Sequence, residues 1–245
     1  MARVSALQWL NLVRHGESTG NLAYQAVWDT DAEESGITER DADIALTPTG
    51  RAQAEALGRW LAALPENERP TRVLTSPYIR TVDTARIALA QAPVDVEVRV
   101  DERLRDREQG ILEGLTPTGI RRRHPEEADR LARLGKFYYR PPGGESWADL
   151  ALRLRSFYRD VEDEAARRRG SGAADGERVL VATHDAIVVM TRYLVENLSE
   201  REVMEIEKTP VANCSVTRWR HDGERLGAIV YNDRAHLTGA GVASA

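Results

Sequence analysis

Four side chains that can bind an anion occur at three separate places in this 245-residue chain. Arg14 and His15 stand together in LVRHGES, Arg80 follows in TSPYIR, and His184 comes in VATHD. Guanidinium groups form bidentate, charge-assisted hydrogen bonds with phosphate or sulfate oxygens, and a neutral imidazole can attack phosphorus near neutral pH. These residue types predict a phosphate pocket, with His15 as the candidate nucleophile.

The same residues suit a divalent cation poorly, because the charge of Arg14 would repel a metal held by His15. The chain has no His-Glu-x-x-His motif, and its one cysteine cannot form a cysteine pair. We therefore expect no metal and no other cofactor.

Phosphoryl transfer needs positive charge on the transferred oxygens and an acid for the leaving oxygen. Arg14, Arg80, His184 and Asn21 can serve the first need. A carboxyl group that burial keeps partly protonated can serve the second. The segment DERLRDREQG offers four such groups, and spacing alone does not choose among them: Asp101, Glu102, Asp106 and Glu108.

The elements that must position these groups read as alternating strands and helices. Apolar residues alternate at period two in residues 94–100 and recur at helical spacing in residues 46–64. The expected strands are 10–13, 71–77, 94–100 and 177–184, and the expected helices are 46–64, 78–92, 146–169 and 185–198. This order predicts an α/β fold with an open, mostly parallel sheet, helices on both faces, and a ligand site at the carboxyl ends of the strands.

The carboxyl-terminal part of the chain is expected to close the sheet. Residues 213–220 and 226–231, joined by a turn at 221–224, read as an antiparallel hairpin at the sheet edge. Such an edge could pair with a second copy and form a homodimer. We expect residues 235–245 to form a loose tail.

Composition favours one domain that binds a small phosphorylated substrate. The chain has 42% hydrophobic and 30% charged residues without a composition shift, so we expect a single domain over residues 1–245. The net charge of −5 argues against nucleic acid and anionic membrane as partners. The lone Cys214 and the absence of room for a signal peptide before Arg14 favour a cytoplasmic protein.

One segment stands apart from this pattern. Residues 29–45 are dense in acids and lack an apolar period. They form either a solvated surface insert or a lid over the site, and the sequence leaves both alternatives open.

Five blocks of the sequence resemble the histidine phosphatase superfamily, also called the phosphoglycerate mutase-like family. They occur in the family's order across about residues 12–232: LVRHGES, TSPYIRTVDTA, RLRDREQGILEG, RPPGGES and VATHD. The resemblance implies the phosphoglycerate mutase-like fold and a catalytic histidine that becomes a phosphohistidine, a role that falls on His15. It also implies metal-free phosphate binding by Arg14, Asn21, Arg80 and His184.

The resemblance leaves three candidates for the proton donor. The family usually has a glutamate four residues before the glycine of its E-x-x-x-G block, and Asp106 holds that position before Gly110. Because aspartate is shorter, Glu108 stays as an alternative. Asp185 is the third candidate, since the pair His184–Asp185 resembles the acid phosphatase branch, in which that aspartate is the donor.

We predict a metal-independent phosphatase that hydrolyses phosphomonoesters through a phosphohistidine. Phosphoglycerate mutase-type transfer is the alternative, but a mutase needs extra basic contacts to retain its product. The mutase branch has an arginine pair before its Pro-rich turn, and the segment RLARLGKFYYRPPGGES lacks that pair. A non-catalytic phospholigand-binding protein is the second alternative.

Overall fold

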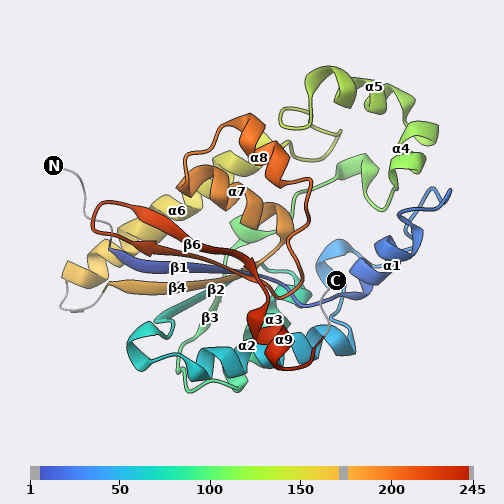
Figure 1. The fold of residues 1–245 in the computed structure, drawn as a ribbon. Helices are drawn as coiled ribbons and strands as arrows, with labels where there is room; N and C mark the ends of the chain where they lie inside the picture. Colours follow the sequence, from blue (N-terminus) through green and yellow to red (C-terminus); the bar gives the residue numbers. More distant parts are fainter. Residues whose placement is uncertain (1–5, 171–175, 243–245) are drawn as a thin grey trace.

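The computed structural model describes residues 6–170 and 176–242, and in these ranges six strands form one mixed sheet. The strand order is β3-β2-β4-β1-β5-β6 (Figure 1). Strands β3, β2, β4 and β1 run parallel to one another. β5 is antiparallel to β1, and β6 is antiparallel to β5 at the edge of the sheet. The strands are β1 (Leu7–Arg14), β2 (Arg72–Thr75), β3 (Val98–Val100), β4 (Glu177–Thr183), β5 (Val216–His221) and β6 (Leu226–Asp233). The predicted fold class and the edge hairpin are confirmed.

Helices cover both faces of this sheet (Figure 1). One layer consists of α6 (Trp147–Gly170), α7 (Asp185–Val195) and α8 (Glu200–Ile206), and the other of α2 (Pro48–Ala63), α3 (Ile79–Ala90) and α9 (Ala235–Gly239). In β4, Val179 and Val181 pack in the first apolar cluster, whereas Leu180 and Ala182 pack in the second. Side chains of a strand alternate between faces, so a strand covered on both faces reads as a continuous apolar run.

Three further helices lie beyond the carboxyl ends of the parallel strands (Figure 1): α1 (Thr19–Val27), α4 (Pro117–Arg123) and α5 (Pro125–Leu134). A capping box starts α1, because Asn21 N donates to Ser18 Oγ at 3.2 Å and Ser18 N donates to Asn21 Oδ1 at 3.0 Å. This helix therefore begins directly beside the loop that carries His15.

The acidic segment 29–45 is bound to α4. Thr116 N donates to Glu33 O at 3.0 Å, and the guanidinium of Arg123 forms an ion pair with the Glu33 carboxylate at 2.8 Å. Arg122 pairs with Asp31 at 2.9 Å. Three acids of this segment, Asp31, Glu33 and Glu34, are thus partners of arginines in α4.

Two expectations for the chain need correction. The predicted strand 94–100 pairs with β2 only over Val98–Val100. The predicted loose tail is wrong for residues 235–239, which form α9, because Leu237 is 1% exposed and packs against the α2–α3 layer. Residues 243–245 of that tail lie outside the described residues.

The loop after β1 is fixed by close backbone packing on α2. A Cβ added to Gly16 would lie 2.4 Å from Gly50 O, and a Cβ added to Gly50 would lie 2.0 Å from Glu17 O. These distances leave no room for a methyl group unless the backbone moves. The position of His15 therefore depends on glycine at residue 50.

We predict that Gly50→Ala lowers the free energy of unfolding by about 1–3 kcal/mol, because overpacking forces the two backbones apart. Denaturant titration followed by circular dichroism measures the change. Gly170→Ala is the matched control, since a Cβ there meets no atom within 4 Å. Equal stability of the Gly50→Ala variant and the parent protein would show that the contact is not tight.

Candidate active site

The carboxyl ends of three neighbouring strands bring His15, His184 and Ser76 together. In the β1–β4 pair Arg14 lies opposite Thr183, so the residues that follow each strand are neighbours. The ring centroids of His15 and His184 are 5.4 Å apart. On the other side of β4, Ser76 follows β2, and its Oγ lies 2.8 Å from His184 Nε2. The structure thus brings together the two imidazoles that the sequence places 169 residues apart.

The contacts of His15 define its protonation. Nδ1 lies 2.7 Å from Gly16 O, and because a carbonyl oxygen only accepts, Nδ1 carries the proton. Nε2 then holds the lone pair and accepts a hydrogen bond from Arg80 Nε at 3.3 Å. Burial, with the charges of Arg80 and Arg14, lowers the pKa of His15 well below 6.5. The buried imidazole is therefore neutral near pH 7, as a nucleophile must be.

Arg80, in the first turn of α3, contacts His184, Asp106 and Asp41 at the centre of the site. Its Nη2 lies 3.4 Å from His184 Nδ1 and 3.8 Å from Asp106 Oδ2. Its Nη1 lies 3.0 Å from Asp41 Oδ1 and also donates to the backbone oxygen of Asp41. Burial, opposed by this arginine, raises the pKa of Asp41.

Hydrogen bonds hold the loop that carries Asp106, and one carboxylate oxygen faces Arg80 and His184. Asp106 Oδ1 accepts from Arg107 N at 2.9 Å, and Asp106 O accepts from Arg153 Nη2 at 2.9 Å. The other oxygen, Oδ2, lies 3.6 Å from His184 Nδ1. Arg153 belongs to α6 and was missed in the sequence, because it lies on an amphipathic helix outside every motif.

Arg14 and Asn21 offer donors to the same place. Arg14 Nη1 donates to Val211 O, whereas the buried Nε has no hydrogen-bond partner among the described residues. Burial lowers the pKa of Arg14. Asn21 Oδ1 accepts from Ser18 N and from Asn213 Nδ2, both at 3.0 Å, which leaves the amide nitrogen as the group that can donate to an anion.

These groups line a cavity of about 470 Å³. Arg14, His15, Asn21, Arg80, Asp106 and Asp185 all lie on its wall, while His184 is fully buried next to His15. Asp41 and Ile44 of the acidic segment also line the cavity. The segment therefore reaches the site, and it is more than a solvated insert.

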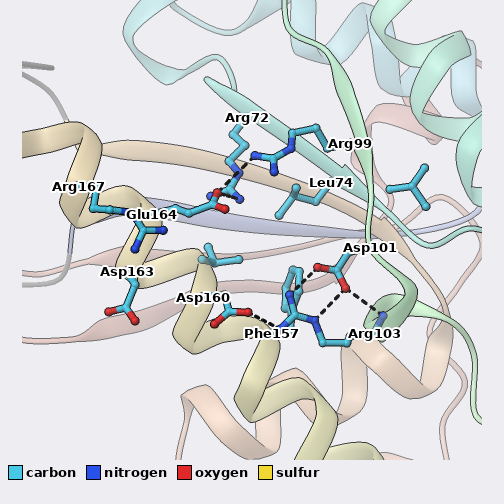
Figure 2. A pocket seen from close by; sticks show the side chains of 12 residues that line it. Arg72, Leu74, Arg99, Asp101, Arg103, Phe157, Asp160, Asp163, Glu164 and Arg167 are labelled. Atoms are coloured by element: carbon cyan, nitrogen blue, oxygen red, sulfur yellow. Dashed lines mark hydrogen bonds and ion pairs between the residues drawn. The ribbon is translucent and has the colours of Figure 1, made fainter. Parts of the chain in front are cut away.

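Three of the candidate acids lie away from this cavity. Glu108 is not among the described lining residues, and its Oε1 accepts from Tyr78 Oη at 3.4 Å. Asp101 lines a different cavity between β3 and α6, where Arg103 holds it through Nε at 2.9 Å and Nη2 at 2.7 Å (Figure 2). Glu102 is exposed.

Two other carboxyl groups on the cavity wall have raised pKa values. Burial raises the pKa of Asp185 to about 6, and its Oδ2 accepts from Val211 N at 3.3 Å. Glu113 is exposed as a residue, but partial burial of its carboxyl group, together with Asp41 and Asp106, raises its pKa to about 7. Glu113 was not named from the sequence, because the acids closer to β3 were considered there.

The donor set around the cavity is that of an anion site. Within residues 6–170 and 176–242, no three His, Cys, Asp or Glu side chains are placed to hold a metal ion. Over the same ranges, no helix is both long enough and apolar enough to cross a bilayer.

A sequence profile of the histidine phosphatase superfamily (branch 1) matches residues 10–234. The chain belongs to this superfamily. A 2,3-bisphosphoglycerate-dependent phosphoglycerate mutase 2 of Gloeobacter violaceus is 31% identical over 217 residues, which are 88% of this chain and 86% of the mutase. A 6-phosphofructo-2-kinase/fructose-2,6-bisphosphatase of Caenorhabditis elegans is 29% identical over 198 residues, which are 80% of this chain and 36% of that protein.

Solved structures of the superfamily share the fold. Mycobacterial glucosyl-3-phosphoglycerate phosphatase in complex with inorganic phosphate has a TM-score of 0.68 and 25% identity, over 94% of this chain and 99% of the phosphatase. Phosphoglycerate mutase from Bacillus anthracis has a TM-score of 0.69 and 20% identity, over 97% of this chain and 98% of the mutase. The similar superfamily members thus include phosphatases and mutases, and the resemblance inferred from the five blocks is confirmed.

We predict that the imidazole of His15 titrates well below pH 6.5, and that Arg80→Gln raises its pKa. The substitution removes a positive charge that disfavours the imidazolium, while burial still keeps the pKa below its ordinary value. Imidazole ¹⁵N NMR over pH 4–8 measures both midpoints. Arg220→Gln is the control, because Arg220 pairs with the surface residue Glu68. An unchanged midpoint in Arg80→Gln would contradict the electrostatic contribution of Arg80.

Proposed function

We propose that this superfamily member is a metal-independent phosphatase that hydrolyses phosphomonoesters through a phosphohistidine on His15. One observation carries the proposal: a neutral, buried imidazole presents its Nε2 lone pair beside the Arg80 guanidinium on the wall of a cavity. An imidazole in that state can attack a phosphorus atom whose oxygens the arginine binds.

In the first step Nε2 of His15 forms a bond to phosphorus as the bond from phosphorus to the ester oxygen breaks. The leaving oxygen takes a proton from Asp106, and the alcohol departs. In the second step water attacks the phosphohistidine, Asp106 accepts a proton from that water, and the phosphorus–nitrogen bond breaks. Inorganic phosphate leaves, and both side chains return to their starting states.

The other groups stabilise charge on the transferred phosphoryl oxygens. Arg80 and Arg14 supply charged donors, the latter through an Nε that has no partner among the described residues, and the Asn21 amide supplies a neutral one. His184 contacts Arg80 through Nδ1 and is anchored by Ser76, so it keeps the guanidinium in place. Donors fixed in advance in a water-poor site give the largest electrostatic stabilisation.

Geometry favours Asp106 as the acid over the two alternatives. Its Oδ2 faces Arg80 and His184, while its backbone is fixed by Arg153. Asp185 has one oxygen engaged by Val211 N, and Glu108 lies off the described wall of the cavity. A carboxyl group must reach the leaving oxygen before its pKa matters.

The charges around the cavity favour a phosphatase over a mutase. A mutase must retain a product that carries both a carboxylate and a phosphate. Lys136, which precedes the Pro-rich turn, forms an ion pair with Glu207, and both line the cavity. The Arg107 guanidinium donates to Glu145 O and to Gln109 Oε1, both at 2.8 Å. Lys136 is thus paired with a carboxylate and Arg107 is held by two neutral oxygens, so both of the further cations on the described wall are engaged by protein groups.

We predict that the protein releases phosphate from p-nitrophenyl phosphate in excess EDTA, and that His15→Ala lowers kcat/KM about a thousandfold or more, because the nucleophile is lost. Steady-state absorbance assays measure this rate. His221→Ala, in the hairpin turn, is the matched control. Activity of His15→Ala equal to the parent would refute the mechanism, and ligand binding without an acid-labile phosphate label on the parent protein would favour the non-catalytic alternative.

We also predict that Asp106→Asn lowers kcat/KM about a hundredfold or more on ethyl phosphate but less than about tenfold on p-nitrophenyl phosphate. The nitrophenolate leaves with little protonation, whereas an alkoxide needs the acid. Asp185→Asn and Glu108→Gln provide the comparison in the same assays. If one of these two variants shows the leaving-group dependence and Asp106→Asn does not, the assignment of the acid is wrong.

A further inference from the structure

One part of the active-site cavity wall is apolar. Its side chains come from the end of α1, the segment after the short 3-10 helix Asp41–Asp43, the 3-10 helix Gly110–Leu112, and α4 with the residues before it. The apolar wall consists of Trp28, Ile44, Leu112, Leu115, Pro117 and Ile120. Neither phosphate binding nor the transfer step uses any of them.

The apolar wall is assembled before a ligand binds. Glu34 and Leu115 form an antiparallel bridge, which joins the acidic segment to the chain just before α4. The ion pair of Arg123 with Glu33 fixes the same junction from α4. A Cβ added to Gly20 would lie 3.2 Å from the Ile44 side chain, so Ile44 packs directly on α1. A preformed apolar surface binds an apolar group without first being ordered.

Trp28 is the large aromatic member of the apolar wall, and it is exposed. Its side chain is 59% exposed at the C-terminal end of α1, although it lines the cavity. A large indole left open to water at a cavity rim gains most when a ligand covers it. Exposed apolar surface next to a reaction centre is typical of a ligand-binding face.

The charges near the apolar wall disfavour a second anion. The described cavity lining contains five carboxyl groups, Asp41, Asp106, Glu113, Asp185 and Glu207, against four cations, Arg14, Arg80, Arg107 and Lys136. Two of these cations serve the reacting phosphate, and the other two have protein partners. The raised pKa of Glu113, about 7 from burial and neighbouring carboxylates, reflects the same negative surroundings.

We propose that this cavity selects phosphomonoesters whose alcohol part is uncharged and apolar, an alkyl or aryl group that lies on the apolar wall. Bisphosphates and phosphoglycerates would bring a second anion to a place that offers carboxylates and engaged cations. The hydrolysis part of this proposal depends on the proposed function. The binding preference depends only on the shape and charge of the cavity.

The test is a series of straight-chain alkyl phosphates. Ethyl, butyl and hexyl phosphate have primary alcohols as leaving groups, so their differences report contacts of the chain. Each buried methylene is worth about fourfold. We expect kcat/KM to rise about tenfold or more from ethyl to hexyl phosphate. For fructose 2,6-bisphosphate and 3-phosphoglycerate we expect a kcat/KM about tenfold or more below that for hexyl phosphate.

Trp28→Ala should reduce the hexyl-to-ethyl ratio of kcat/KM severalfold, because it removes apolar surface on which the longer chain lies. Leu152→Ala is the matched control, since Leu152 is 63% exposed on α6 and is not on the described cavity wall. A ratio that stays constant in Trp28→Ala overturns the role of this side chain in selection.

Calorimetry with ethylphosphonate and hexylphosphonate separates this proposal from the proposed function, because phosphonates bind without being hydrolysed. Tighter binding of hexylphosphonate supports the apolar selection even if no ester is hydrolysed, an outcome that refutes the phosphatase alone. Equal phosphonate affinities, or a flat alkyl series with a phosphohistidine still formed on His15, overturn the apolar selection and leave the phosphatase standing.

Discussion

A buried arginine beside a neutral histidine is the interaction on which this site depends. Arg80 is 4% exposed, and a cation so far from water must have anionic or dipolar partners. Asp41 provides the charge, while the imidazoles of His15 and His184 provide nitrogen acceptors. Burial, reinforced by the same guanidinium, lowers the pKa of His15 and keeps the imidazole neutral. A phosphate dianion that enters the cavity would be a further anionic partner of Arg80. It would lie directly against His15, the proposed nucleophile.

The parallel pairing of β1 with β4 brings His15 and His184 together beside Arg80. It also explains why much of the site could be predicted from the sequence. Strands covered on both faces are marked by apolar runs, and their carboxyl ends are marked by the polar residues that follow. Two such ends, at His15 and His184, must meet if their strands are neighbours. Arg80 could be added because its helix starts just after β2. Strand alternation and the position of each strand end therefore predicted the fold and the residues that the structure brings together at the cavity.

The remaining parts of the site depend on polar contacts between distant segments, which have no period in the sequence. Asp41 reaches Arg80 from an acidic stretch that resembled a surface loop, and Arg153 reaches the Asp106 loop from the middle of a long helix. The extent of β3 was overestimated for a related reason. Residues 94–100 alternate as a strand should, but β3 is an edge strand whose one neighbour, β2, begins at Arg72, and the pairing starts only at Val73 and Val98.

The acidic segment 29–45 contributes both to the charged centre of the site and to the apolar wall. Asp41 compensates the charge of Arg80, and three residues later Ile44 contributes to the apolar wall. Arg122 and Arg123 hold the start of the segment on α4, which carries Ile120 of the same wall. A change in the ion pairs of α4 would therefore shift the apolar wall and the carboxylate on Arg80 together. In the proposed function, a change in this segment would alter the preferred alcohol while His15, Arg14 and Arg80 stay in place.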